Sequence, residues 1–418
     1  MRGASPCKIL AMNETAGNTS NTPRGVLADI RVLDFGRYVA GPYCATLLGF
    51  LGAEVIRIER REGGEDRYIA PVAAGGEGGV FFQTGCNKKS LTLDPGKPGA
   101  RELIARLVAT ADVVVANLPP AQLRNLGIDY QTLRAIRPDI ILTTQTAFGD
   151  SGPYAHRGGF DGVGQAMSGA MYITGEPGAP AKAAAPYVDF GTAVLCAFGT
   201  LAALMHRERT GEGQEVKGTL LGTALAAFGS HLAEQGATGI NRVGTGNRVQ
   251  TSAPSAVFRT RDGHLLTHVV GNGLFRRWAK LMGDEAHWTG DERYRDDASR
   301  GDHSALILER MAAWCAERNT AEALQALDAA GLPAGPIHTP QQALDDPQVA
   351  AMRFLHAIAD FPGLRRAVPV SGLPVDLSAT PAARPGRPPL LGEHTAAILA
   401  ELGYTGDEIC SLQAHGVV

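Results

Sequence analysis

The sequence predicts an α/β protein built around a mostly parallel, Rossmann-like sheet. Between residues 29 and 146, short apolar segments alternate with helical segments, a pattern typical of βαβ units. The length of 418 residues predicts two to three domains. Phe35–Pro42 reads FGRYVAGP and not GxGxxG, which disfavours a nicotinamide enzyme and leaves a nucleotide-like ligand at the strand ends.

The elements of this sheet follow in order along the chain. The strands expected from apolar runs are 29–34, 54–59, 90–94, 112–118 and 139–146. Helices are expected over 43–51 and over 98–110, where Pro98 suits a first helical turn.

A long helix over 189–209 dominates the middle of the chain. It is apolar almost throughout and stops before Gly211, so we expect a central buried helix. Another helix is expected over 220–235. A hairpin turning at Asp262–Gly263 is expected within 258–270. The remaining helices are expected over 274–282, 305–318, 320–330 and 395–402, which makes 240–335 a smaller α+β segment.

Composition excludes several classes of function. The net charge of −3 indicates no general affinity for nucleic acid or membranes, and we expect no apolar run long enough to span a bilayer. The first 24 residues lack the pattern of a signal peptide and are expected to be a disordered tail. The 6 cysteines are scattered and the 11 histidines form no ligand motif, which predicts a cytoplasmic protein without metal or disulfides.

Asp189 is the candidate catalytic residue. It begins the long helix, where a carboxylate can serve as an N-cap for the backbone N–H groups. The same position suits a nucleophile, since neighbouring N–H groups would stabilise an oxyanion and Gly191 would leave room for a substrate. The capping interpretation and the catalytic one both remain open on these residues alone.

Cations and polar groups follow several predicted strands. Arg60 comes after the second strand, and Lys88, Lys89 and Lys97 lie around the third. Asn117–Pro120 ends the fourth, and Arg124 follows it. These residues fit either solvated loops or a phosphate-binding crevice at the carboxyl edge of the sheet.

Several motifs together resemble family III coenzyme A transferases, the CaiB/BaiF or formyl-CoA transferase-like group. They run in order from residue 25 to 418: VLDF…AGP…LGAEVIRIE over 32–59, NKKSLTLD over 87–94, Asn117 with Leu126–Gly127, GFD over 159–161 with Ser168–Gly169, Asp189 with Gly191, TGEGQ over 210–214 and PLLGEHT over 389–395.

The resemblance implies a large Rossmann-like domain made from both chain ends and a smaller domain, in an interlocked homodimer. The large domain would comprise 25–225 and 336–418, and the small one 226–335. The family's nucleophilic aspartate matches Asp189. Its CoA-binding positions match Val39, Ala40, Arg60, Leu93, Asp94, the following turn with Lys97, Asn117, Leu118, Pro119, Arg157, Gly158, Gly159 and Phe160.

One position departs from the family's pattern. Many relatives carry a phosphate-binding arginine two residues before the glycine of the Leu126–Gly127 pair, where this chain has Asn125. The adjacent Arg124 or another cation is expected to take over that contact. A glycine-rich lid of some relatives matches Gly244–Arg248 loosely.

The implied activity is CoA transfer from an acyl-CoA donor to a carboxylic acid through an aspartyl-CoA thioester. CoA would be a substrate, with no permanently bound cofactor. Succinyl-CoA is the expected donor and a dicarboxylic acid the expected acceptor, with Arg242, Arg248 or Arg259 as cations for its second carboxylate. The alternatives are an acyl-CoA racemase or isomerase of the same fold, a nicotinamide oxidoreductase and a non-catalytic CoA-binding relative. Such a racemase needs a histidine where this chain has Phe160.

Overall fold

The computed structural model describes residues 25–418, so the tail expected over 1–24 lies outside the described residues. The described chain divides into two compact units. The large unit contains 25–167, Ala185–Ala227 and Met352–Val418, and the small unit contains Ser168–Ala184 and Phe228–Ala351. Domain boundaries at residues 225 and 336 stay a prediction. The small unit also includes residues 168–184, which the sequence analysis placed in the large domain.

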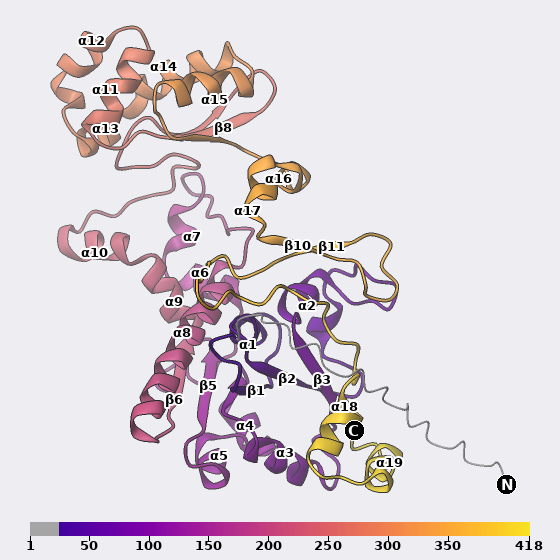
Figure 1. The fold of residues 1–418 in the computed structure, drawn as a ribbon. Coiled ribbons are helices and arrows are strands. Elements are labelled where there is room, and N and C mark those ends of the chain that lie inside the picture. The colour runs from indigo at the N-terminus through magenta and orange to yellow at the C-terminus, as the bar shows by residue number, and fades with distance from the viewer. Residues whose placement is uncertain (1–24) are drawn as a thin grey trace. The chain divides into compact units, whose positions relative to one another are not determined.

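The large unit is built on six parallel strands in the order β3-β2-β1-β4-β5-β6 (Figure 1). They are β1 (Arg31–Asp34), β2 (Glu54–Glu59), β3 (Lys88–Thr92), β4 (Val113–Ala116), β5 (Ile141–Thr146) and β6 (Glu215–Thr219). Leu33 on β1 is paired with Ile56 on β2 and with Val114 on β4. Successive strands are added on one side of β1 up to β3 and on its other side from β4 onward, although all of them are parallel. Open α/β sheets bind ligands at such a switch point between β1 and β4.

Five of these strands were predicted, and β6 was not. β6 is the edge strand beside β5 and carries Glu215 and Lys217 with little burial. Charged side chains are common on edge strands because they discourage pairing with another chain. The hydrophobic run that predicts a central strand is therefore missing from β6.

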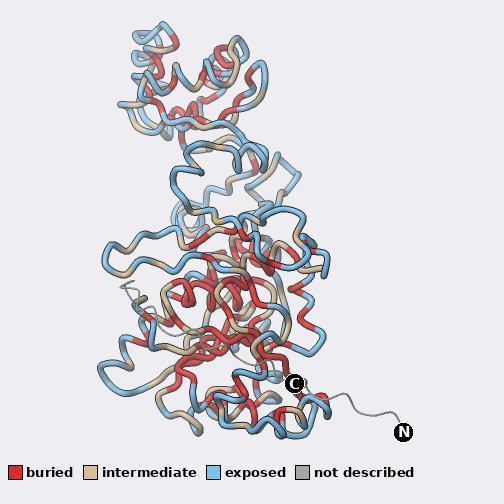
Figure 2. The backbone as a smooth tube through the Cα atoms, turned by 45° about the vertical axis from the view of Figure 1, so that its right-hand side comes forward, coloured by how far each residue is buried: buried red, intermediate tan, exposed pale blue. Residues whose placement is uncertain are grey.

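Helices cover both faces of this sheet. On one face α1 (Ala40–Phe50) and α8 (Tyr187–Thr210) pack over Val113, Val115 and Ile141. On the other face α3 (Ala100–Ala109) and the C-terminal helices pack over Leu33 and Ile56. Figure 2 shows buried backbone concentrated in this layered part of the large unit. Its other helices are η1 (Glu65–Tyr68), α2 (Gly79–Thr84), α4 (Pro120–Leu126), α5 (Tyr130–Ile136), α6 (Asp161–Met167), α9 (Leu220–Ala227), α18 (Thr395–Glu401) and α19 (Gly406–Ala414).

Helix α8 corrects one expectation from the sequence. By length and composition it is apolar enough to cross a bilayer, and it is the one such helix in residues 25–418. It nevertheless packs against α1, β5 and β6, with Thr192, Cys196 and Thr200 buried. The expectation that α8 is buried on all sides is wrong, because Val194, Leu195, Phe198 and Met205 on one of its faces are exposed.

A buried ion-pair network ties residues 389–395 to the strands. Glu59 accepts hydrogen bonds from Arg67 at 2.6 and 3.1 Å, and Arg67 also donates to the Pro389 carbonyl at 3.1 Å. Arg57 pairs with Asp66 at 2.5 Å. Burial alone would raise the pKa of Glu59, but Arg57 and Arg67 outweigh it and lower that pKa to about 2. Charges this deeply buried require such partners.

The C-terminal segment of the large unit also contributes a two-stranded antiparallel hairpin. Its strands are β10 (Leu355–Ile358) and β11 (Val368–Ser371). Gln83 of α2 donates a hydrogen bond to the Ser371 carbonyl of β11 at 3.0 Å. The polar, proline-rich stretch over 379–389 follows without helix or strand.

The small unit has its own core around Trp278, Met311 and Trp314. Its antiparallel sheet has the order β7-β8-β9, with the predicted hairpin formed by β7 (Ser255–Arg259) and β8 (His264–His268) and completed by β9 (Ala334–Pro336). The helix expected over 220–235 is instead two helices that meet at Phe228. The helices of this unit are α7 (Ala170–Ile173), α10 (Gly229–Thr238), α11 (Asn272–Leu281), α12 (Glu285–Gly290), η2 (Glu292–Tyr294), α13 (Asp297–Asp302), α14 (Ser304–Ala316), α15 (Thr320–Ala329), α16 (Pro340–Asp345) and α17 (Pro347–Met352).

Candidate active site and coenzyme A pocket

Asp189 lies in the first turn of α8 but does not begin that helix. The helix starts two residues earlier, at Tyr187. The capping carboxylate is Asp161, whose Oδ1 accepts hydrogen bonds from the N–H groups of Val188 at 2.7 Å and Asp189 at 3.2 Å. The expectation that Asp189 caps its own helix is therefore wrong, and among residues 25–418 no hydrogen bond engages its carboxylate.

The surroundings of Asp189 make its carboxylate more basic than usual. Burial, followed by the negative charge of Asp161, raises the pKa of Asp189 to about 6. A carboxylate of this pKa is mostly ionised at neutral pH and is more nucleophilic than an ordinary aspartate. The two N–H groups expected to stabilise an oxyanion are already bonded to Asp161, so other donors would have to serve.

The residues after Asp189 attach α8 to its neighbours. Phe190 makes an edge-to-face ring contact with Tyr43 of α1, with ring centroids 4.7 Å apart. A Cβ added at Gly191 would lie 3.0 Å from Thr223 Cγ2 on α9. Gly191 thus allows close packing of two helices, which corrects the expectation that it leaves room for a substrate.

An aromatic pair lies beside this helix start. Phe160, which precedes Asp161, is 60% exposed, and its ring meets the Tyr38 ring edge-to-face at 5.3 Å. Tyr38 has a left-handed backbone with φ of 61°, a conformation that is costly for a bulky residue and is often kept at functional sites. Val39 and Ala40, both predicted binding residues, follow Tyr38 as the buried start of α1.

A cavity of about 340 Å³ lies where β1, β2, β3 and β4 end. It brings together four of the predicted binding residues, Arg60, Leu93, Leu118 and Asn125. Phe35, Arg37, Ile58, Glu59, Pro95, Gly96, Gln122 and Leu126 complete its lining. Mixed apolar and cationic lining at the carboxyl edge of a parallel sheet suits a nucleotide-like ligand. We refer to it as the strand-end pocket.

Some predicted binding residues support the strand-end pocket without lining it. Asn117 fixes the loop after β1, since its Oδ1 accepts from the Arg37 N–H at 2.6 Å and its Nδ2 donates to the Arg37 carbonyl at 2.7 Å. Asp94 accepts from the Gly96 N–H at 2.9 Å and so shapes the turn after β3. Pro119 is the N-cap residue of α4, and Lys97 is exposed outside the lining.

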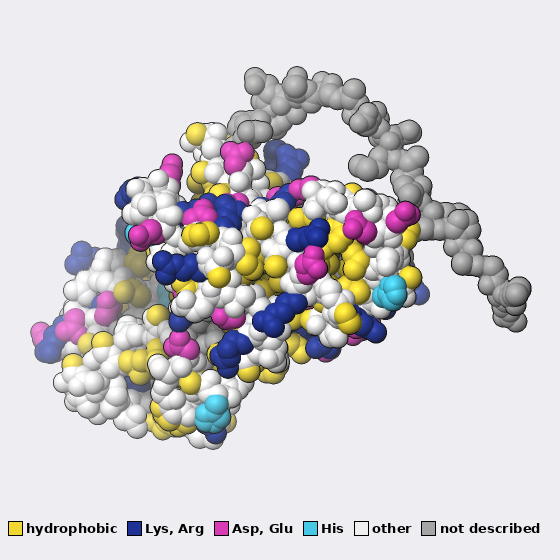
Figure 3. Space-filling model, turned by 90° about the horizontal axis from the view of Figure 1, so that it is seen from below, with side chains coloured by type: hydrophobic (Ala, Val, Ile, Leu, Met, Phe, Trp, Pro, Cys, Tyr) yellow, Lys and Arg dark blue, Asp and Glu magenta, His cyan; other side chains and the backbone are white. Residues whose placement is uncertain are grey.

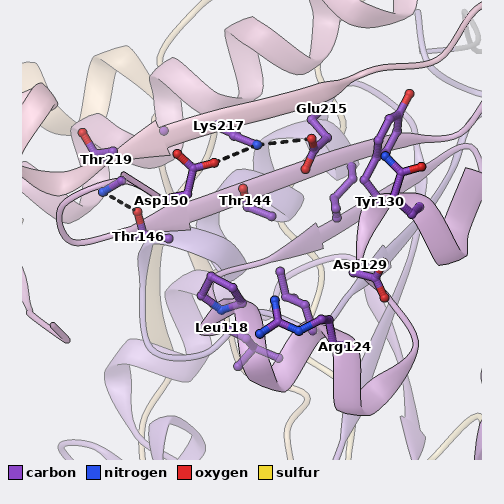
Figure 4. A pocket seen from close by; sticks show the side chains of 16 residues that line it. Leu118, Arg124, Asp129, Tyr130, Thr144, Thr146, Asp150, Glu215, Lys217 and Thr219 are labelled. Carbon is purple, nitrogen blue, oxygen red and sulfur yellow. Dashed lines mark hydrogen bonds and ion pairs between the residues drawn. The ribbon is translucent and has the colours of Figure 1, made fainter. Parts of the chain in front are cut away.

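Arg124 faces a different cavity. Helix α4 separates the two, with Asn125 on the strand-end pocket and Arg124 on a second cavity of about 430 Å³ between α4, β5 and β6. In Figure 4 the Arg124 side chain extends into this second cavity, while Lys217 is held by Asp150 and Glu215. Its placement gives Arg124 no contact with the strand-end pocket.

The other predicted cations have partners of their own. Lys88 is buried and pairs with Asp34 at 2.7 Å, and Lys89 pairs with Glu54. Arg157 lies over the Tyr154 ring at 4.7 Å, in the exposed segment that contains Gly158 and Gly159. Lys88 is therefore unavailable to a phosphate, and Lys89 lies in a partly exposed pair outside the lining of the strand-end pocket.

In the small unit, two predicted substrate cations are also engaged. Arg242 donates to both carboxylate oxygens of Glu234 at 2.5 Å, and Arg248 donates to Ser304 at 3.1 Å. Arg259, at the end of β7, is exposed. The loop matched to the family's lid packs Gly244 against the Gly175 backbone.

Sequence reasoning missed Arg37, Tyr38 and the capping role of Asp161. Arg37 could have been found, because polar residues that follow parallel strands gather at one sheet edge. The left-handed backbone of Tyr38 and the hydrogen bonds of Asp161 carry no local sequence signal. Both depend on contacts between segments far apart in the chain.

Comparison with known proteins places the whole chain beside CoA-transferases. The profile of CoA-transferase family III matches residues 27–395. A succinyl-CoA–D-citramalate CoA-transferase from Chloroflexus aurantiacus is 35% identical over 96% of this chain and 100% of its own length. A succinate–glutarate CoA-transferase from Agrobacterium fabrum is 35% identical over 90% of this chain and 95% of its own length.

Two further relatives extend the comparison. A succinyl-CoA:mesaconate CoA-transferase from Haloarcula hispanica is 34% identical over 91% of this chain and 97% of its own length. The crystal structure of a CaiB/BaiF family protein from Brucella suis superposes with a TM-score of 0.79 at 32% identity, over 91% of this chain and all of that one. The chain belongs to CoA-transferase family III.

Proposed function

We propose that this transferase moves CoA from succinyl-CoA to a dicarboxylic acid, with Asp189 as nucleophile. The observation that carries the proposal is the half-buried Asp189 carboxylate. It is not used as a helix cap, because Asp161 accepts the hydrogen bonds from the first turn of α8. The three relatives described above are named for succinyl-CoA or succinate together with citramalate, glutarate or mesaconate. All three acceptors are dicarboxylic acids, which supports the same substrate class here.

The first half of the reaction transfers CoA to the enzyme. An oxygen of Asp189 attacks the thioester carbon of succinyl-CoA, and the C–S bond breaks to give a succinyl-aspartyl anhydride and CoA thiolate. The thiolate then attacks the Asp189 carbonyl carbon. This step releases succinate and leaves an aspartyl-CoA thioester.

The second half returns CoA to the acceptor. A carboxylate oxygen of the acceptor attacks the aspartyl thioester carbon, which frees CoA thiolate and forms a second anhydride. The thiolate attacks the acceptor's carbonyl carbon, giving the new acyl-CoA and restoring the Asp189 carboxylate. No water, proton donor or oxidant is consumed, so the site has to hold the anhydride away from water.

The placement of Asp189 suits these steps. With a pKa of about 6, Asp189 is ionised at neutral pH and can attack the thioester. In the last step, when CoA thiolate attacks the acceptor's carbonyl carbon, the Asp189 carboxylate leaves more readily than a more strongly basic group would. The strand-end pocket offers a place for the nucleotide portion of CoA, with Arg60 at its rim. Binding energy from this remote portion positions the thioester for reaction.

The racemase alternative is not favoured. Racemization requires a proton donor and acceptor at the substrate's α-carbon. The benzyl side chain of Phe160 cannot transfer a proton and lies next to Asp161, whose carboxylate is bonded to Val188, Asp189 and Gln165.

We also infer a homodimer in the cytoplasm. Along one face of α8, Val194, Leu195, Phe198 and Met205 are each at least 50% exposed, and Phe198 reaches 70%. An apolar helix face of this kind is typical of a surface that a second copy covers.

The surface and the cysteines bear on the compartment. Acidic and basic side chains intermingle on the face seen in Figure 3. None of the cysteines among residues 25–418 is part of a disulfide, which fits a reducing compartment.

Trapping of the acyl-enzyme tests the proposed function. The protein is incubated with succinyl-CoA, treated with hydroxylamine or borohydride, and digested for peptide mass analysis. Modification at Asp189 that is absent from Asp189→Ala, together with CoA exchange into free dicarboxylic acids, would support the mechanism. A protein that binds CoA but gives neither adduct nor exchange with a broad panel of acyl-CoA donors would overturn it.

A further inference from the structure

The strand-end pocket lacks the cation expected on α4. The position is Asn125, whose neutral amide lines the pocket, and Arg124 beside it faces the second cavity. Two other arginines line the strand-end pocket, Arg37 after β1 and Arg60 after β2. A ligand with phosphate groups would meet these two guanidinium groups first.

The position of Arg37 is fixed by its backbone. Both its N–H and its carbonyl are hydrogen-bonded to the Asn117 side chain, at 2.6 and 2.7 Å. These bonds join the ends of β1 and β4, the two strands at the switch point of the sheet. The Arg37 side chain therefore starts from a rigid point at the edge of the strand-end pocket.

The guanidinium group of Arg37 is not fully satisfied. Its Nε is buried and forms an ion pair with Asp66 Oδ1 at 3.6 Å, which is too long for a hydrogen bond, and neither atom has a hydrogen-bond partner among residues 25–418. Asp66 itself pairs with Arg57 at 2.5 Å. The Arg37 guanidinium thus lacks the full set of hydrogen bonds that burial normally requires.

Glu65 connects the two arginines. Its carboxylate forms an ion pair with Arg37 Nη2 and also lies 3.8 Å from Arg60 Nη1. The Glu65 side chain is 63% exposed and that of Arg60 is 57% exposed. A carboxylate thus occupies the position between two guanidinium groups that a phosphate of similar charge and geometry could take, and its exposure leaves it free to move into solvent.

We propose that Arg37 and Arg60 together bind a phosphate group of CoA, and that Glu65 competes with this phosphate for both arginines. The inference rests on the proposed function, because it takes CoA as the ligand of the strand-end pocket. It assigns to Arg37 the contact that Asn125 cannot make. Glu65 then weakens binding of CoA and speeds its release, which suits an enzyme that must let its acyl-CoA product go.

The test is isothermal titration of CoA and of dephospho-CoA, which lacks the 3′-phosphate, into the wild type and single variants. Arg37→Gln should weaken CoA binding about 10-fold or more, the value of one charge-assisted hydrogen bond. Glu65→Gln should tighten it by roughly threefold or more because the competing charge is gone. The matched control Arg106→Gln removes an exposed arginine paired with Glu102 on α3 and should bind CoA like the wild type.

The two CoA species identify the phosphate. If Arg37→Gln loses affinity for CoA but not for dephospho-CoA, the arginines hold the 3′-phosphate, and an equal loss for both places them on the diphosphate. Unchanged affinity in Arg37→Gln, weaker binding in Glu65→Gln, or a comparable loss in Arg124→Gln would each overturn the proposal. The exposed Glu65→Gln variant keeps the test decisive if Arg37→Gln does not fold.

Activity separates this inference from the proposed function. In the wild type, exchange of labelled succinate into succinyl-CoA measures the transferase directly. If that exchange is absent while CoA binding depends on Arg37 as described, the proposed function fails and the phosphate site stands. If exchange occurs and the KM for succinyl-CoA is the same in Arg37→Gln, the transferase stands and the phosphate site fails.

Discussion

The Oδ1 atom of Asp161 accepts a hydrogen bond from the Asp189 N–H at 3.2 Å. One carboxylate therefore caps α8 and also places a negative charge beside the nucleophile. Together with burial, that charge raises the pKa of Asp189 to about 6. Helix capping and tuning of the nucleophile thus depend on the same side chain.

The first prediction concerns the pH dependence of transfer. Because protonated Asp189 cannot attack a thioester, kcat/KM for succinyl-CoA should fall as the pH drops below about 6. Asp161→Asn keeps an oxygen that can accept the two N–H bonds but removes the charge, so the acid limb should move to lower pH. Burial still raises the pKa in this variant, which makes the shift partial. A pH–rate profile that does not move would show that Asp161 leaves the nucleophile unaffected.

The second prediction concerns the stability cost of Asp189. Its folded pKa lies above the value of 3.8 expected for an unfolded aspartate, so the unfolded state ionises more readily and stability falls as the pH rises through this window. Asp189→Asn removes that cost. Its Tm should exceed that of the wild type at pH 8 by about 2 °C or more, with a smaller difference at pH 5. Scanning calorimetry at both values measures this, and a lower Tm at pH 8 would contradict it.

The third prediction concerns the buried network around Glu59. Glu59→Gln leaves Arg57 and Arg67 without their carboxylate and should lower the free energy of unfolding by about 3–5 kcal/mol. The folded pKa of Glu59 is lowered to about 2, so its contribution is present above about pH 4.5 and is lost as the pH falls toward 2. Urea unfolding at pH 7 measures the change. Glu102→Gln, which breaks only an exposed pair with Arg106, should cost less than about 1 kcal/mol.

The fourth prediction concerns the exposed face of α8. Phe198→Glu places a charge in the centre of that face and should convert a homodimer to monomers, because an unpaired charge is costly in an apolar interface. Size-exclusion chromatography with light scattering measures the mass. Arg209→Glu, at the exposed end of the same helix, serves as the charge-changing control. A monomeric wild type, or a dimeric Phe198→Glu, would argue against α8 as the interface.

The parallel sheet could be predicted because its signals are local. The strands at Glu54–Glu59 and Ile141–Thr146 are short apolar runs between turns, and they were found to within two residues. The edge strand Glu215–Thr219 lacks that pattern and is fixed by pairing with β5, not by its own composition. Helix α19 does carry a local signal, the capping box of Thr405 and Glu408, which the sequence analysis passed over.

The candidate site was predictable in part for the same reason. Motif resemblance located Asp189 and four residues of the strand-end pocket. It could not show that adjacent residues Arg124 and Asn125 face opposite cavities, since that depends on how α4 is rotated on the sheet. Nor could it show that Lys88 forms a buried ion pair with Asp34, which is 54 residues away in the chain.

The hydrogen bond from Arg67 to the Pro389 carbonyl spans 322 positions of the chain. On a ribosome adding 5–20 residues per second, Arg67 emerges roughly 16–64 s before its acceptor does. Throughout that interval, the nascent sheet carries a buried arginine whose last acceptor has not been made. The buried polar contacts of the large unit therefore cannot be completed before residues near 389 have been synthesised.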